Sequence, residues 1–422
     1  MKLEKISIFG LGYIGLPTAA ALATQRTQVI GIDVNESAVN TINEGKIHIV
    51  EPELDVAVQA AVSRGYLRAS TTPELADAFI IAVPTPFHDE HQPNLDYIEA
   101  AASAIAPVLE KGNLVILEST SPVGTTSQIC EWLATHRPDL SFPHNAGEDS
   151  DIRVAYCPER VLPGKVMYEL AMNDRVIGGI TNSCSIAAQQ LYKIFVQGDC
   201  VITDAATAEL CKLTENAMRD VNIAFANELS LVCDKLDISV WELIKLANLH
   251  PRIDILQPGP GVGGHCIAVD PWFIISQSPE LTPLMQAARG VNDGKPKWIV
   301  QKFNDLTKKW LEDNPGATSE QIKVACFGLA FKANIDDLRE SPALNIALEI
   351  ATCHPGQTFL VEPNIEETPA IFQSTKAVLI NTADAIRSAD ILVLLVDHDE
   401  FTEAQENWKD RHIIDSRGLW TS

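Results

Sequence analysis

The sequence predicts an α/β protein in which two doubly wound, parallel-sheet lobes are joined by a central helical region. Short strand-like runs alternate with helical patterns through residues 1–200, and the same alternation returns from Gln321. Such alternation is typical of parallel sheets that are covered by helices. Between these stretches, residues 205–235 form one long helical pattern that contains neither Gly nor Pro.

The expected strands are bounded by Gly, Pro, Asp or other polar turn residues. In the first lobe they are Ile6–Phe9, Gln28–Ile32, Ala78–Val83 and Leu114–Leu117, with a helix at Pro17–Thr24. The central region continues after its long helix with a second helical stretch, Val240–Asn248. In the second lobe they are Lys323–Phe327, Thr358–Val361, Asp390–Val396 and His412–Ile414, with a helix at Pro342–Cys353.

Chain length and turn composition predict where the domains divide. At 422 residues the chain is longer than one hydrophobic core usually covers, so two or three domains are expected. Lys309–Glu320 contains Asp-Asn-Pro-Gly-Ala-Thr-Ser, a composition typical of a linker. We therefore expect domains at 1–200, 201–308 and 309–422.

The composition excludes several classes of function. A formal net charge of −24 opposes nonspecific binding to nucleic acid or anionic lipid. An anionic small molecule can still bind, provided that Lys and Arg side chains are gathered at its site. No run of eighteen apolar residues occurs, so no membrane-spanning helix is expected, and the first ten residues lack a signal-peptide pattern. Nine cysteines without a Cys-x-x-Cys pair argue against disulfides and zinc, which favours a reducing cytoplasm.

A glycine-rich turn follows the first expected strand. Gly10-Leu-Gly-Tyr-Ile-Gly15 joins that strand to a helix, which is the context that a dinucleotide-binding turn requires. Asp33 ends the second strand, where a carboxylate binds ribose hydroxyls and repels a 2′-phosphate. The alternative is a tight turn without a ligand. Strand, glycines, helix and acid in register favour a Rossmann-like site for NAD over NADP.

Hydroxyl side chains follow the next two strands. Val83-Pro-Thr-Pro86 and Glu118-Ser-Thr-Ser-Pro-Val-Gly-Thr-Thr126 come where cofactors bind at the carboxyl edge of open α/β sheets. Their hydroxyls suit ribose or amide groups, but they also suit turns and helix N-caps. The sequence leaves both interpretations open.

The long central helix carries cations on one face. Lys212, Asn216 and Arg219 stand at i, i+4 and i+7, and the apolar residues that follow indicate a central helix. Buried cations need partners, and an anionic substrate is one such partner. The alternative is a surface ion-pair stripe with Glu215 and Asp220.

A second glycine-rich loop holds a thiol. Gln257–Pro271 contains four glycines, then Cys266, with Asp270 four residues later. Glycine lets a backbone approach a ligand closely, so this density favours an exposed, reactive thiol. A buried structural cysteine is the nearly equal alternative.

Further loops supply charge near these motifs. They are Cys157–Gly164, His250-Pro-Arg252, Phe327–Lys332 and Asp336–Pro342. Together with the helix cations they provide the local basic cluster that an anionic substrate requires. His88 and His91 lie in a polar segment without a third ligand, so no metal site is expected.

In order and spacing, these motifs resemble the NAD-dependent UDP-sugar 6-dehydrogenases over nearly the whole chain. The matching segments are Gly10–Gly15, Val83–Pro86, Ser119–Val123, Pro158–Glu159, Lys212 with Asn216, Gly263–Asp270, Phe327–Lys332 and Arg339–Ser341. Within the family, the likeness of Cys157–Gly164, Arg219–Glu228 and His250–Arg252 is to bacterial members that oxidise UDP-N-acetyl-D-mannosamine. Their product enters surface polysaccharides such as enterobacterial common antigen.

The resemblance implies a four-electron oxidation of a primary alcohol to a carboxylate with two NAD. Cys266 would trap the intermediate aldehyde as a thiohemiacetal, which is oxidised to a thioester and hydrolysed. Lys212 and Asn216 would stabilise oxyanions, and Asp270 would act as or orient a base. Glu159 would assist proton transfer and hydrolysis, and Thr120 would position water or substrate.

The resemblance also implies which residues bind the ligands. Those that contact NAD would be Gly10, Gly12, Tyr13, Ile14, Gly15, Asp33, Thr85, Thr126 and Arg339. Those that hold the UDP-sugar would be Arg160, Val161, Lys212, Asn216, Arg219, His250, Arg252, Gly263, Phe331, Lys332 and Arg417. The first domain would then bind NAD and the third the UDP-sugar, and Ala206–Lys235 would form the interface of a homodimer or higher oligomer.

Three other functions compete with this one. A UDP-glucose or UDP-N-acetylglucosamine 6-dehydrogenase would use the same mechanism. A two-electron hydroxyacid dehydrogenase of the 6-phosphogluconate type shares the Lys-x-x-x-Asn helix but needs neither the cysteine loop nor the carboxyl-terminal lobe. A non-enzymatic NAD sensor would leave Cys266, Lys212 and Asp270 without a purpose.

Overall fold

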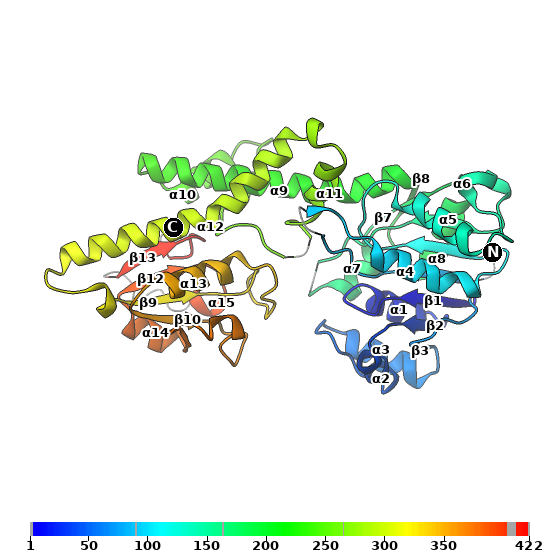
Figure 1. Cartoon of the computed structure of the whole chain (residues 1–422), viewed down its shortest axis with the longest axis horizontal. Helices are drawn as coiled ribbons and strands as arrows, with labels where there is room; N and C mark the ends of the chain where they lie inside the picture. Colours follow the sequence, from blue (N-terminus) through cyan, green and yellow to red (C-terminus); the bar gives the residue numbers. More distant parts are fainter. Residues whose placement is uncertain (1–2, 89–90, 163, 265, 403–410, 421–422) are drawn as a thin grey trace. The chain divides into compact units, whose positions relative to one another are not determined.

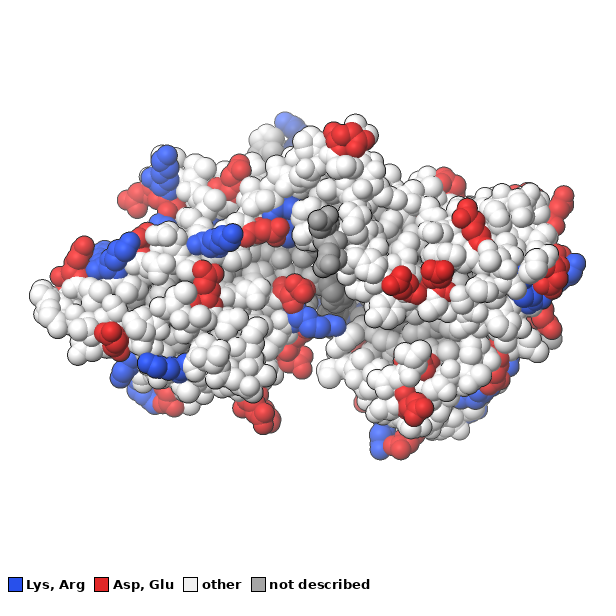
Figure 2. Space-filling model, in the orientation of Figure 1, with Lys and Arg blue, Asp and Glu red and all other residues white. Residues whose placement is uncertain are grey.

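The computed structural model describes residues 3–88, 91–162, 164–264, 266–402 and 411–420. The chain divides into two compact units, Met1–Glu215 with Trp272–Gln277, and Asn216–Pro271 with Ser278–Ser422. Figure 1 shows the helices and strands of each unit in chain order. Lys and Arg side chains are interspersed with Asp and Glu on the face of each unit drawn in Figure 2, rather than collected in one patch.

The first unit contains an eight-stranded sheet of order β3-β2-β1-β4-β5-β6-β7-β8. Neighbouring strands are parallel except β6 and β7, which pair antiparallel. The strands are β1 (Lys5–Phe9), β2 (Gln28–Ile32), β3 (Leu67–Ser70), β4 (Ala78–Ile81), β5 (Leu114–Leu117), β6 (Arg153–Tyr156), β7 (Arg175–Gly179) and β8 (Cys200–Asp204). The four strands predicted here are confirmed, although β4 ends two residues earlier than expected.

Helices cover both faces of this sheet because alternate strand residues point to opposite sides. Ile6 and Ile8 of β1 pack with one set of helices, whereas Phe9 packs with the other. The first set is α1 (Gly15–Thr24), α3 (Leu54–Ser63), α7 (Val166–Met172) and α8 (Asn182–Tyr192). The second set is α4 (Asp96–Ile105) and α5 (Thr125–His136). This unit also contains α2 (Glu36–Asn43), whose Val39 and Ile42 pack with the first set of helices, and the short α6 (Pro143–Ala146).

The central region is helical, as predicted. It consists of α9 (Ala205–Leu236), α10 (Val240–Ala247), α11 (Asp270–Gln277) and α12 (Pro283–Asp313). One expectation is wrong, because Lys309–Asp313, assigned to a linker, is the last turn of α12. This helix persists through Pro296 because its buried residues, among them Ile299 and Phe303, pack against the second sheet and outweigh the local breaker.

The second unit contains a five-stranded parallel sheet of order β11-β10-β9-β12-β13. The strands are β9 (Lys323–Phe327), β10 (Gln357–Val361), β11 (Val378–Leu379), β12 (Ile391–Leu394) and β13 (His412–Asp415). One face packs against α12 and α13 (Pro342–Cys353), and the other against α14 (Thr382–Ser388) and α15 (Asp399–Thr402). The predicted fold class, two doubly wound lobes with a helical region between them in the chain, is confirmed. Among the described residues, no helix combines the length and apolar character that crossing a bilayer needs.

Candidate active site

The glycine turn after β1 has the shape of a dinucleotide site. Gly10 has φ of +90°, and a Cβ there would lie 2.5 Å from the Ala82 carbonyl oxygen. A Cβ on Gly15 would lie 1.8 Å from the Gly10 oxygen, so both positions require glycine for packing. A Cβ on Gly12 would meet no atom within 4 Å. Packing therefore does not explain Gly12, whereas close approach of a pyrophosphate does.

Asp33 lies directly after β2 and holds this turn. Its carboxylate accepts hydrogen bonds from the backbone N–H of Leu11 at 2.8 Å and of Asn35 at 2.9 Å. A carboxylate has about four acceptor positions, so capacity remains for ribose hydroxyls. Tyr13 is 42% exposed beside the turn, and Ile14 is the N-cap residue of α1. The turn and acid thus fit NAD, which would supply the hydride acceptor when bound.

The loops after β4 and β5 are hydrogen-bonded to each other. Thr85 Oγ1 donates to the Thr120 carbonyl at 2.7 Å, and Ser119 Oγ donates to the Val83 carbonyl at 2.7 Å. These bonds hold the half-buried Thr85 and Thr120 at the carboxyl edge of the sheet.

Thr126 is engaged by a residue that the sequence did not single out. Glu209 of α9 accepts from the Thr126 hydroxyl at 2.6 Å, from its N–H at 2.8 Å and from the Gly124 N–H at 2.6 Å. The carboxylate thereby caps the N-terminus of α5, where negative charge is favoured. Burial nevertheless raises the pKa of Glu209. Thr126 is not the N-cap residue of α5, which is Gly124, and its contact with NAD stays a prediction.

Glu159 lies in the loop after β6 and is an acid with a strongly raised pKa. Burial raises its pKa to about 7, against the lowering effect of the positive charges of Lys212 and Arg175. Its Oε1 atom is buried and has no hydrogen-bond partner among the described residues. A carboxyl group that titrates near neutrality suits general acid–base catalysis.

A buried ion pair, also missed from the sequence, underlies the Glu159 loop. Arg175 and Glu118 are almost fully buried, with Arg175 Nη1 3.7 Å from Glu118 Oε1. Arg175 also donates to the Pro158 carbonyl at 3.5 Å and lies over the ring of Tyr192. Because Pro158 precedes Glu159, this pair helps to fix the loop. Glu118 and Arg175 lie at the ends of two different strands, so no local sequence pattern predicts that they pair.

The cation face of α9 is not an ion-pair stripe. Glu215 is bound by Arg160, with Nη2–Oε1 at 2.6 Å and Nε–Oε2 at 3.1 Å, and Asp220 is bound by Arg289 at 2.7 Å. Both acids of the proposed stripe are therefore held by other cations. Lys212 is half-buried and acts electrostatically on Glu159, whereas Arg219 is exposed. Arg160 lies beside Val161, which is half-buried.

In the second unit, Asn216 and Asp270 meet. Asn216 Nδ2 donates to Asp270 Oδ2 at 2.6 Å, and Asp270 is buried at the first position of α11. The backbone N–H groups of Val269 and Asp270 donate to the Cys266 carbonyl at 3.0 and 2.8 Å. A tight turn thus leads from the thiol into α11. Cys266 is exposed, so it is not the buried packing cysteine of the alternative interpretation.

The glycines of the thiol loop permit close packing on the second lobe. A Cβ on Gly264, whose φ is +79°, would lie 3.0 Å from Phe331 Cε2. A Cβ on Gly263 would lie 2.4 Å from the Glu340 carbonyl oxygen. Arg417 also approaches this loop, since its Nη1 would lie 2.6 Å from a Cβ on Gly259.

The remaining predicted ligand-binding residues of this unit are exposed or ion-paired. Arg417 binds Asp397 at 2.8 Å, and Arg339 binds Asp337 at 2.6 Å. Lys332, His250 and Arg252 are exposed. Of the predicted catalytic residues, Thr120, Glu159 and Lys212 belong to the first unit, and Asn216, Cys266 and Asp270 to the second.

Comparison with known proteins identifies the family. Three models of the UDP-glucose/GDP-mannose dehydrogenase family match, namely the NAD binding domain at residues 4–196, the central domain at 206–294 and the UDP binding domain at 325–422. UDP-N-acetyl-D-mannosamine dehydrogenase of Yersinia pestis is 60% identical over 421 residues, covering 100% of both chains. NDP-N-acetyl-D-galactosaminuronic acid dehydrogenase of Ralstonia nicotianae is 59% identical over 418 residues, covering 99% of this chain and 96% of that one.

A solved structure agrees with these relatives. The UDP-D-ManNAc dehydrogenase of Pyrococcus horikoshii superposes with a TM-score of 0.86 at 36% identity, covering 98% of this chain and 96% of that one. The chain therefore belongs to the UDP-glucose/GDP-mannose dehydrogenase family and is an NAD-dependent dehydrogenase with a UDP binding domain.

Proposed function

We propose that this enzyme oxidises C6 of UDP-N-acetyl-D-mannosamine to the carboxylate, giving UDP-N-acetyl-D-mannosaminuronate for a bacterial surface polysaccharide such as enterobacterial common antigen. The observation that carries the proposal is the exposed thiol of Cys266, one turn before a buried Asp270 that binds Asn216. A two-electron alcohol dehydrogenase has no need of this thiol. The full-length relatives that share this substrate in their names support the choice of sugar.

The chemistry divides into two oxidations with a covalent intermediate between them. The alcohol loses its hydroxyl proton and a hydride from C6 to become an aldehyde. The Cys266 sulfur then adds to the aldehyde carbon, and the thiol proton passes to the former carbonyl oxygen, which gives a thiohemiacetal. Loss of a second hydride and of the hydroxyl proton gives a thioester. Water displaces the sulfur, which leaves the carboxylate and the regenerated thiol.

Protein side chains stabilise the charge that these steps develop. We assign the Lys212 ammonium and the Asn216 amide to the oxygen at C6, which becomes anionic when the thiol or water adds to the carbon. The bond from Asn216 Nδ2 to Asp270 orients that amide. With a pKa raised to about 7, Glu159 can accept a proton from the attacking water near neutral pH. Thr120 is assigned to hold that water or the substrate.

The activity is tested with a substrate panel. UDP-N-acetyl-D-mannosamine should give two NADH per molecule of acid, and mass spectrometry should identify the uronate. UDP-N-acetylgalactosamine belongs in the panel because a 59% identical relative is named for an N-acetylgalactosaminuronic acid. A preference for that sugar, UDP-glucose or UDP-N-acetylglucosamine would refute the assigned substrate. One NADH per substrate would instead refute the four-electron reaction.

We further propose that α9 forms a homodimer interface. Met218, Phe225 and Val232 recur every seven residues, so they share one helix face, and they are 57%, 52% and 48% exposed. A second copy of the chain would remove this stripe from water. Phe225→Glu should lower the mass measured by analytical ultracentrifugation to that of a monomer. An unchanged mass in that variant, or a monomeric wild type, would disprove this interface.

A further inference from the structure

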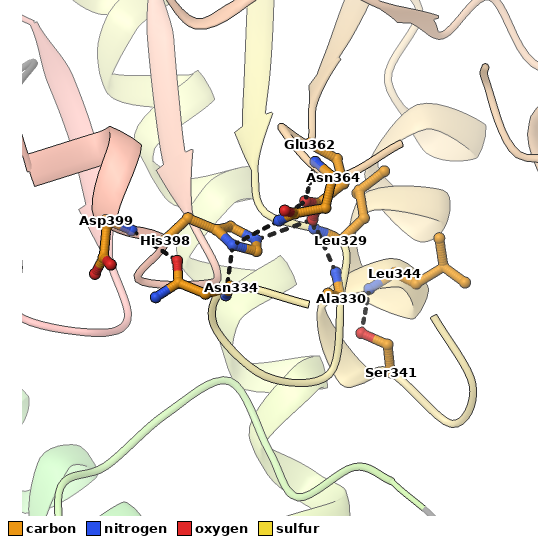
Figure 3. A network of polar contacts seen from close by, with 9 residues as sticks. All are labelled: Leu329, Ala330, Asn334, Ser341, Leu344, Glu362, Asn364, His398 and Asp399. Atoms are coloured by element: carbon orange, nitrogen blue, oxygen red, sulfur yellow. Dashed lines mark hydrogen bonds and ion pairs between the residues drawn. The ribbon is translucent and has the colours of Figure 1, made fainter. Parts of the chain in front are cut away.

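A buried carboxylate lies at the carboxyl edge of the second sheet (Figure 3). Glu362 follows β10 directly, and its Oε2 accepts hydrogen bonds from Leu329 N at 2.8 Å, Ala330 N at 3.1 Å and His398 Nε2 at 3.0 Å. Its Oε1 accepts from the backbone and side-chain nitrogens of Asn364, both at 3.1 Å. Five donors thus converge on one buried side chain.

His398 is the second half of this arrangement. It is 1% exposed and lies between Glu362 and the loop that follows β9 (Figure 3). Its Nδ1 faces the backbone N–H of Asn334 at 2.9 Å. A backbone N–H can only donate, so Nδ1 is the acceptor and Nε2 carries the proton given to Glu362. The imidazole therefore joins the carboxylate to the far end of the loop.

The residues between these anchors are the ones that matter for the active site. The pair holds the loop at Leu329 and Ala330 on one side and at Asn334 on the other. Phe331 and Lys332 lie between them. Phe331 packs against the backbone of Gly263 and Gly264, since Cβ atoms there would lie 3.2 Å from its Cβ and 3.0 Å from its Cε2.

We propose that Glu362 and His398 are positioning residues, which hold Phe331 against the thiol loop and present Lys332 to the nucleotide-sugar. Neither touches the reacting atoms. They act through the loop that they fix at both ends, and so set the position of the Phe331 side chain, against which Gly263 and Gly264 pack. The part that concerns the nucleotide-sugar depends on the proposed function, whereas the part that concerns the two loops does not.

Three substitutions at His398 separate its bond to Glu362 from its bond to Asn334; its Nδ1 also accepts from Asn364 Nδ2 at 3.2 Å. In His398→Asn the side-chain oxygen can still accept from Asn334 but the amide no longer reaches Glu362. In His398→Gln the longer side chain can still donate to Glu362 but no longer accepts from Asn334. His398→Ala removes all three contacts. His354→Gln is the matched control, because His354 is also buried in this lobe and bonds the Ile322 carbonyl at 2.9 Å, away from the loop.

Hydrogen–deuterium exchange with mass spectrometry gives the first measurement, and it needs no ligand. Exchange should rise about tenfold or more in peptides that cover 328–334 and 257–264 of His398→Ala, and less in the Asn and Gln variants. Loss of the Asn334 bond frees that amide directly, and loss of the Glu362 bond loosens the carboxylate that holds the amides of Leu329 and Ala330. His354→Gln should leave these peptides unchanged. Unchanged exchange in all three His398 variants, or a rise spread evenly over the lobe, would overturn the proposal.

Calorimetry with UDP and steady-state kinetics give the second measurement. His398→Ala should bind UDP about tenfold more weakly and raise KM for the UDP-sugar by a similar factor, with the affinity for NAD unchanged. If wild type binds no UDP and oxidises no UDP-sugar, the proposed function fails while the exchange result still decides the positioning role. Wild-type UDP affinity in the His398 variants would refute the role in substrate binding.

Discussion

The first five strands of each sheet follow the same plan, and the differences lie in the loops that end them. Their orders are β3-β2-β1-β4-β5 and β11-β10-β9-β12-β13. In each, a glycine with positive φ follows the first strand, Gly10 at +90° and Gly328 at +87°. In each, that glycine donates its N–H at 2.8 Å to the last residue of the second strand, Ile32 or Val361.

The acid that follows the second strand separates the two lobes. Asp33 takes two backbone donors and stays half-buried, whereas Glu362 takes five donors and is buried. The glycines differ too, because Ala330 and Ala333 stand where Gly12 and Gly15 stand in the first lobe. One lobe keeps its acid and its turn open to a dinucleotide. In the second lobe, the acid at the equivalent position, Glu362, accepts hydrogen bonds that hold a loop.

The largest effect is expected at the thiol, which belongs to neither sheet. Cys266→Ser should lower the rate of acid formation about a thousandfold or more, because the hydroxyl cannot replace the thiol in the covalent intermediate. NAD and UDP affinities, measured by calorimetry, should stay near those of wild type. A fully active Cys266→Ser enzyme would disprove the covalent route.

Glu159 offers a second contrast with Glu362. Burial raises the pKa of Glu159 to about 7, whereas hydrogen bonds from His398 and from backbone N–H groups outweigh burial and lower the pKa of Glu362. The rate of acid formation should therefore rise with pH through about 7, and Glu159→Gln should lose this rise together with about a hundredfold in rate. An unchanged pH profile in Glu159→Gln would show that another group is the base.

The same raised pKa predicts a stability effect of defined sign. Between about pH 4.5 and 7 the folded state holds a proton on Glu159 that the unfolded state has released, so the free energy of unfolding falls as pH rises through this window. Urea titrations of Glu159→Gln should lack this part of the fall. The comparison with wild type at pH 5 and at pH 8 measures it.

The features that could be predicted from the sequence are those encoded by residues that are contiguous in the chain. Gly10–Gly15 lie within one turn, and the strand that precedes Asp33 is an apolar run with clear ends, so these elements were found. The end of helix α12 was assigned to a linker because Asn314-Pro-Gly316 follows it, whereas packing of Trp310 and Leu311 against the hydrophobic cluster of the second sheet keeps it helical to Asp313. Glu209 bonds Thr126 from 83 residues away, and His398 bonds Glu362 from 36 residues away. Only the fold brings such partners together.

Exchanging the glycines tests the two turns directly. Gly12→Ala should leave stability nearly unchanged, because its Cβ would meet no protein atom within 4 Å. It should weaken NAD about ten- to hundredfold, because a methyl group forced into a filled site costs about 1–3 kcal/mol. The reciprocal Ala330→Gly should create no NAD site in the second lobe. Normal NAD binding by Gly12→Ala would place the pyrophosphate elsewhere.

The smallest difference in cofactor binding is expected from replacing each acid by its amide. Asp33→Asn keeps an oxygen for Leu11 but loses the charge that binds the ribose hydroxyls, so KM for NAD should rise about tenfold and discrimination against NADP should weaken. Glu362→Gln should leave KM for NAD unchanged. It should instead lower the free energy of unfolding, because an amide NH2 in place of one oxygen leaves buried donors unpaired at about 1–3 kcal/mol each. A rise in KM for NAD in Glu362→Gln, or the same loss of stability in both variants, would contradict the assignment of Asp33 to cofactor binding and of Glu362 to holding the loop.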